Sequence, residues 1–119
     1  MHQVLIIAND RLTRAYLRAQ LEEEGFDTTL TTDLLDAALR LRDDGIDPDI
    51  IVIDTQELEI EPEILDTLRE LAGQTQLLII QSATDFPVKV RWDGHIERLS
   101  RPVSIEQMVN LIKQLTKNH

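Results

Sequence analysis

The chain has 119 residues, a length typical of one domain, so we expect a single domain over residues 1–119. It contains no cysteine, which excludes disulfides and cysteine-based zinc sites, and its three histidines show no metal-binding spacing. A formal net charge of −10 argues against general affinity for nucleic acid or anionic membrane.

No apolar run approaches the roughly 20 residues that a membrane span needs. The first residues lack the basic flank and the cleavage signal of a secretory peptide. Together with the absence of cysteine, these features lead us to expect a cytoplasmic protein without a membrane contact.

The first third of the chain predicts two strands and two helices. Residues 4–8 form a continuous apolar run of strand length, and Asp10 is a candidate N-cap for a helix over 11–24 that ends before Gly25. The threonine-rich stretch 26–32 predicts a more exposed strand. Apolar residues then recur with helical spacing from 34 to 41.

The rest of the chain continues this alternation. Residues 50–53 and 77–80 are short apolar runs that predict buried strands, and a helix that starts at Pro62 and ends before Gly73 lies between them. The sequence 104–107 has the form of a capping box and predicts a last helix to about residue 115.

Strands that alternate with helices and are apolar on both faces predict a parallel sheet that is covered by helices on both sides. Right-handed crossovers place the carboxyl ends of all strands at one edge. Polar residues that follow the strands should therefore gather there, and in open α/β sheets that edge is where sites form. The candidates are Asn9, Asp10, Asp54, Ser82 and Arg101.

This set of side chains suits a phosphoryl site. The Asp54 carboxylate could attack a phosphoryl donor and form an acyl phosphate. The Ser82 hydroxyl and the Arg101 cation would stabilise charge on the phosphoryl oxygens.

The same pattern resembles the receiver domain of bacterial response regulators over essentially the whole chain, through "VLIIAND", "PDIIVIDT", "LLIIQSA" and "LSRP". The resemblance implies a CheY-like, flavodoxin-like fold with a five-stranded parallel sheet in the order 2-1-3-4-5. It also implies that Asp54 matches the phosphoacceptor, that Ser82 and Arg101 match the phosphate-contacting residues, and that a histidine kinase or another signalling protein is the partner.

The sequence departs from the family where Mg²⁺ is normally held. Two acidic residues usually follow the first strand, and those positions are Ala8 and Asn9 here, with Asp10 one residue later. Loss of two carboxylates predicts a weak or absent Mg²⁺ site built from Asn9, Asp10 and Asp54. Since a shift of one residue turns a strand-end side chain to the other face, helix capping is the expected role of Asp10.

The interval between Ser82 and Arg101 is short for a helix and a fifth strand. Its sequence "VKVRWDGHIERL" contains the Asp93–Gly94 pair, a hairpin signal. We therefore expect the fourth helix of the family to be short or to be replaced by an irregular or extended segment. Trp92 is equally suited to core packing and to anchoring a partner.

The leading hypothesis is a pseudo-receiver that signals through protein–protein contact and is not an enzyme. A homodimer could form through the face built by the fourth crossover and the last helix. One alternative is a working Mg²⁺-dependent phosphorylation switch. A more distant alternative is a small α/β enzyme or nucleotide-binding domain, which lacks support because no glycine-rich phosphate loop is present.

Overall fold

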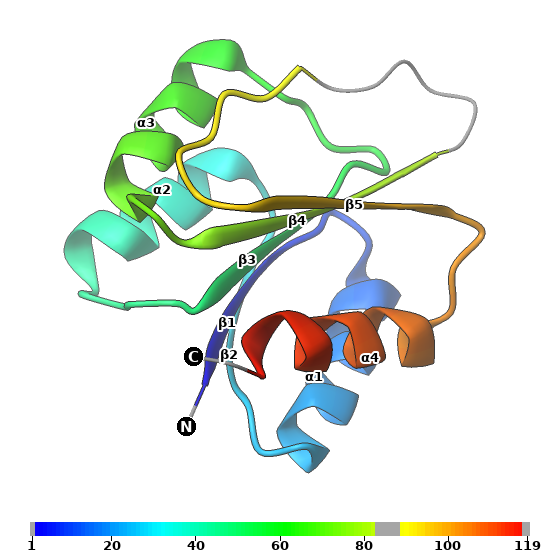
Figure 1. Cartoon of the computed structure of the whole chain (residues 1–119). Coiled ribbons are helices and arrows are strands. Elements are labelled where there is room, and N and C mark those ends of the chain that lie inside the picture. The colour runs from blue at the N-terminus through cyan, green and yellow to red at the C-terminus, as the bar shows by residue number, and fades with distance from the viewer. Residues whose placement is uncertain (1, 83–88, 118–119) are drawn as a thin grey trace.

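A computed structural model describes residues 2–82 and 89–117 (Figure 1). Five parallel strands form one sheet in the order β2-β1-β3-β4-β5, which confirms the fold class that the sequence predicts. In chain order the strands are β1 Gln3–Ile7, β2 Asp27–Thr31, β3 Ile50–Asp54, β4 Gln76–Ser82 and β5 Ile96–Arg101. The helices are α1 Arg11–Glu23, α2 Leu34–Asp43, α3 Pro62–Ala72 and α4 Ile105–Thr116.

The apolar strand runs are buried because helices cover both faces of the sheet. Along β1, Val4 and Ile6 join a core cluster with α1 and α4, whereas Leu5 and Ile7 join a second cluster with α2 and α3. This division follows from the alternation of side chains along a strand. The central strand β3 is buried along its whole length, including its last residue, Asp54.

Local signals fix the ends of the helices. The Asp10 carboxylate caps α1 by accepting a hydrogen bond from the backbone N–H of Thr13. Ser104 and Gln107 form the expected capping box of α4. Gly73 ends α3 with a φ of 60°, a conformation that favours glycine. Among the described helices, the longest has 13 residues, and none is long and apolar enough to cross a membrane.

The fourth crossover contains no helix in the part that the structure describes, residues 89–95, which run as an extended and irregular segment past α3 (Figure 1). This agrees with the prediction that the fourth helix is short or replaced, while residues 83–88 lie outside the described residues. Asp93 and Gly94 bend the chain, but no hairpin forms there, because β5 pairs in parallel with β4 from Leu77–Ile96 to Ser82–Arg101.

Side-chain hydrogen bonds hold the second half of this crossover against the rest of the domain. The indole N–H of Trp92 donates to the carbonyl oxygen of Thr75 at 2.7 Å, and its half-buried ring packs beside the core. The Arg69 guanidinium on α3 donates twice to the Asp93 carboxylate, at 2.9 and 3.1 Å. Trp92 therefore serves the packing of the domain.

Candidate functional site

The site lies at the carboxyl edge of the sheet and is centred on Asp54, the last residue of β3. The residue is 2% exposed although it carries a carboxylate. Burial of a charge is costly unless the charge is paired and hydrogen-bonded. Asp54 meets this requirement through two neighbours, Gln56 and Arg101.

The Arg101 guanidinium forms an ion pair with the Asp54 carboxylate, with Nη2 donating to Oδ2. The other carboxylate oxygen, Oδ1, accepts from the backbone N–H of Gln56 at 3.1 Å. Arg101 ends β5, and its peptide bond to Pro102 is cis. Because Arg101 stands at the end of β5 and Asp54 at the end of β3, the fold itself brings this pair together across β4.

Ser82 lies on the same side of the site. It is the last residue of β4 and stands opposite Arg101 in the register of the two strands. Ser82 and Arg101 line a cavity of about 320 Å³ with the first residues after β3, namely Thr55, Gln56 and Glu57. The loop is held by Thr55, whose backbone N–H and hydroxyl both donate to the Ile80 carbonyl oxygen, at 2.9 and 3.1 Å.

The structure does not bring Asp10 to this cavity. Both the backbone N–H and the hydroxyl of Thr13 donate to Asp10 Oδ2, at 3.2 and 2.6 Å, so this carboxylate is turned toward α1. The hydrogen bond from the Thr13 hydroxyl is the main cause that lowers the pKa of Asp10 below its usual value. Asp10 therefore acts as a helix cap, as its position in the sequence predicts.

Asn9 is exposed and lines a different cavity, between α2 and the loop after β3. Ala8 is fully buried and contributes a methyl group to the α1 and α4 side of the core. Neither of the two positions that carry acids in receiver domains therefore presents a carboxylate at Asp54.

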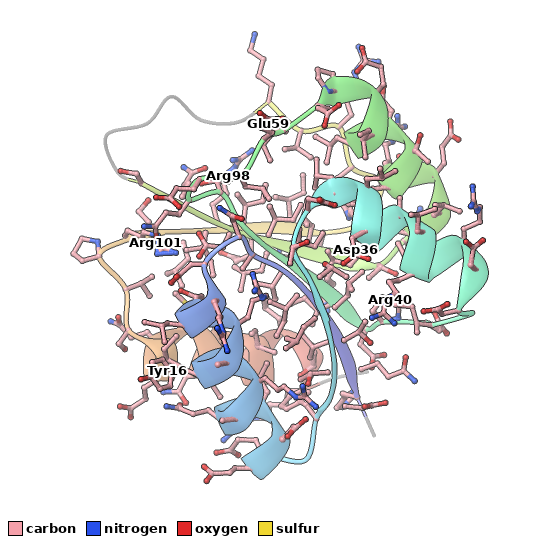
Figure 2. All side chains as sticks on the ribbon, turned by 180° about the vertical axis from the view of Figure 1, so that it is seen from behind. Tyr16, Asp36, Arg40, Glu59, Arg98 and Arg101 are labelled. Atoms are coloured by element: carbon pink, nitrogen blue, oxygen red, sulfur yellow. The ribbon has the colours of Figure 1, made fainter. Side chains whose placement is uncertain are left out.

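Sequence reasoning missed Arg14. Its Nη1 donates to the carbonyl oxygens of Ala8 and Asn9, at 2.6 and 2.8 Å, and so places a cation at the end of β1. The available signal was its place four residues after the Asp10 cap, on a helix that begins beside the end of β1. Arg98, in turn, is exposed and donates to the Gln81 side chain at 3.0 Å; Figure 2 shows Arg98 and Arg101 along β5.

The side chains present do not fit a magnesium ion. Mg²⁺ requires oxygen ligands in octahedral geometry and is held through carboxylates. Asp54 already binds a guanidinium, Asp10 binds Thr13, and Ala8 has no side-chain ligand. Within residues 2–82 and 89–117, no three histidine, aspartate or glutamate side chains gather in a way that could hold a metal.

Comparison with known proteins supports the same fold. The structure resembles the receiver domain of NtrC4 from Aquifex aeolicus, with a TM-score of 0.76 and 23% identity over 98% of both chains. It also resembles the receiver domain of the Francisella response regulator 1452, with a TM-score of 0.73 and 22% identity over 98% of both chains. The Vibrio cholerae chemotaxis response regulator CheY4 matches with a TM-score of 0.73 and 16% identity, over 97% of this chain and 98% of that one.

No family model and no curated protein matches the sequence. The shared architecture nevertheless covers nearly the whole chain and includes the sheet order 2-1-3-4-5. The protein has the CheY-like fold of response-regulator receiver domains, as its sequence motifs predict.

Proposed function

We propose that this chain is a receiver-like signalling module that works through protein–protein contact, without Mg²⁺-dependent phosphorylation of Asp54. The observation that carries the proposal is the Asp54–Arg101 ion pair beside a β1 end without acids. The guanidinium supplies the positive charge that the buried carboxylate needs. Asp54 thus keeps the phosphoacceptor position but has a permanent protein cation as its partner.

The same geometry opposes attack by the carboxylate on a phosphoryl donor. A nucleophilic oxygen must approach the phosphorus in line, and Asp54 Oδ2 is engaged by Arg101. The remaining oxygen, Oδ1, is engaged by the Gln56 backbone. The next residues along the chain include Glu57, Glu59 and Glu61, whose charge repels an anionic donor.

The proposed partner is a histidine kinase or another signalling protein of a two-component pathway in the cytoplasm, and the module itself is not an enzyme. With a net charge of −10 we do not expect it to contact nucleic acid directly. A homodimer through the fourth-crossover and α4 face remains part of the proposal.

Chemical phosphorylation tests the proposal. The protein is incubated with Mg²⁺ and acetyl phosphate and its intact mass is measured; in parallel, beryllofluoride is added and amide chemical shifts are followed by NMR. We expect an unchanged mass and no large shifts around Asp54. Stoichiometric modification that is absent from Asp54→Asn would reject the proposal.

A working phosphorylation switch is the second candidate, and it is favoured by one observation. Ser82 and Arg101 line one cavity directly beside Asp54, as the phosphate-contacting pair of a receiver would. This candidate requires measurable Mg²⁺ affinity that disappears in Asp54→Asn. Isothermal titration calorimetry that detects no binding at millimolar Mg²⁺ would count decisively against it.

A further inference from the structure

A groove lies between the start of α3 and residues 89–91, the first described residues of the fourth crossover. The groove has a volume of about 540 Å³, within the range of ligand pockets. Its apolar wall consists of Pro62 together with Ile60, Leu65 and Val90. Beneath the last three of these residues an apolar cavity of about 10 Å³ continues between Ile53 and Ile79.

Two cations flank this groove. In an extended segment successive side chains point to opposite sides, so that Val90 packs on the core while Lys89 and Arg91 are exposed. In the part of the chain that the structure describes, neither cation forms an ion pair or hydrogen bond, whereas Arg40, Arg42 and Arg69 are all paired. One carboxylate, Asp66 on α3, lines the other side.

The charge of the groove differs from that of the molecule as a whole. At physiological ionic strength the Debye length is about 8 Å, so a bound group senses mainly the charges beside it. The residues that line the groove carry two cations and one carboxylate, Lys89, Arg91 and Asp66, although the net charge of the chain is −10. The neighbouring Glu59 and Glu61 line the cavity beside α2 instead. The local chemistry therefore favours an anionic ligand with an apolar part.

The backbone of the same segment identifies the kind of ligand. Residues 89–91 lie outside any helix or strand, and their side chains alternate between exposed and half-buried, as in an extended segment. Within the described residues their backbone N–H and C=O groups make no hydrogen bond, in contrast to the Trp92 and Asp93 side chains that follow. Figure 1 shows this segment running beside α3. An extended segment with unpaired backbone groups can accept a second strand, and this mode of peptide recognition uses backbone bonds for affinity and pockets for specificity.

We propose that this groove binds an extended acidic segment of a partner protein, which pairs with the backbone of residues 89–91. An apolar side chain of the segment would enter between Leu65 and Val90, and its carboxylates would face Lys89 and Arg91. The inference rests on the proposed function only in that the module acts by protein contact. It does not depend on the state of Asp54.

The experiment uses a capped peptide that alternates glutamate with valine and leucine, and follows the fluorescence of Trp92, the only tryptophan. We expect saturable binding that weakens about tenfold or more in K89E/R91E, because two attractive charges become repulsive. The matched control R11E/K117E has the same net charge and alters two exposed residues that do not line the groove, so its affinity should stay within about twofold of wild type. Thermal unfolding verifies that both variants fold.

A second measurement on the unaltered protein is independent of mutagenesis. Raising the salt concentration about tenfold should weaken peptide binding several-fold, since the rim charges are exposed. A peptide with lysine in place of glutamate should not bind, and neither should octanoate, which carries an apolar chain and a carboxylate but no backbone to pair.

The proposal is overturned if the acidic peptide does not saturate, if both double variants lose affinity equally, or if octanoate binds as tightly as the peptide. It is also overturned if the wild-type protein self-associates and K89E/R91E abolishes that association, because the occupant of the groove is then a second copy of the chain. Peptide binding and acetyl phosphate modification are separate readouts, so failure of this inference is distinguishable from failure of the proposed function.

Discussion

At the residue scale, the central feature is a buried carboxylate whose only charged partner in the described chain is Arg101. The two residues of this ion pair differ in exposure: the Asp54 side chain is 3% exposed and the Arg101 side chain is 23% exposed. Water can therefore hydrate the guanidinium if its partner is lost, but it cannot hydrate the carboxylate in the same way. This asymmetry leads to a prediction about stability.

We expect Arg101→Met to lower the free energy of unfolding by about 3 kcal/mol, because it leaves the buried Asp54 charge without its counterion. Asp54→Asn should cost about 1 kcal/mol, since the amide retains an acceptor and the remaining cation is partly hydrated. Urea unfolding at pH 7 measures both values. Arg98→Met, an exposed position on the same strand, is the control and should cost less than about 1 kcal/mol. A larger cost for Asp54→Asn than for Arg101→Met would contradict this explanation.

Asp10 provides a prediction about pH. Because the Thr13 hydroxyl lowers the pKa of Asp10 in the folded protein, the cap contributes stability that is complete above its unfolded pKa of about 3.8. That contribution is lost as the pH falls through the lower, folded pKa. Asp10→Ala should therefore lower the thermal midpoint clearly at pH 6 and much less at pH 2.5 (about one unit below that unfolded value). An effect that is equal at the two pH values would show that the Asp10 charge has no role in capping.

The sequence identifies Asp54, Ser82 and Arg101 as neighbours because topology alone brings strand ends together. The ion pair itself does not follow from the sequence, since it depends on side-chain direction and on the path of the chain around Pro102. A related reason explains why the sequence does not predict the role of Arg14. Its bonds are to backbone carbonyls, and no residue pattern marks a carbonyl as a ligand.

At the scale of elements, the short fourth crossover distinguishes this molecule. The sequence predicts β1 to β4 and the four helices within a few residues, because most of them have regular apolar faces or clear end signals, but it gives no range for β5. Residues 89–92 alternate polar and apolar side chains as a strand would, but the path of residues 89–95 is set by tertiary contacts of Trp92, Asp93 and Gly94 that the sequence does not reveal. The Asp93–Gly94 pair produces a bend and not a hairpin, because β5 finds its partner in β4.

Gly94 tests how closely this crossover is packed. A Cβ atom at this position would lie 2.4 Å from the Gln74 carbonyl oxygen and 2.5 Å from that of Thr75. We expect Gly94→Ala to cost about 2 kcal/mol, because backbone atoms must move to admit the methyl group. Gly25→Ala, where φ is 89° and the surrounding space is open, should cost about 1 kcal/mol. Urea unfolding, monitored by Trp92 fluorescence, compares the two variants. Equal losses of stability would argue against a close approach of Gly94 to the backbone of residues 74 and 75.

At the scale of the whole molecule, the domain combines a CheY-like fold, without a helix in the described part of its fourth crossover, with a buried acid that is paired with an arginine. Arg101 binds Asp54 and Arg14 binds the end of β1, so the positive charge of the site belongs to the chain itself. The domain should consequently hold its folded state without a metal. Under the proposed function, the site maintains the structure and contact surfaces carry the signal.

A Mg²⁺ titration followed by amide NMR tests this claim most directly. In parallel with the wild type, we would titrate the double variant A8D/N9D, which restores acids at the two family positions. We predict that millimolar Mg²⁺ leaves the signals of Asp54 and its neighbours unchanged in the wild type and shifts them in the double variant. Saturable shifts in the wild type, with Asp54 among the affected residues, would contradict the account.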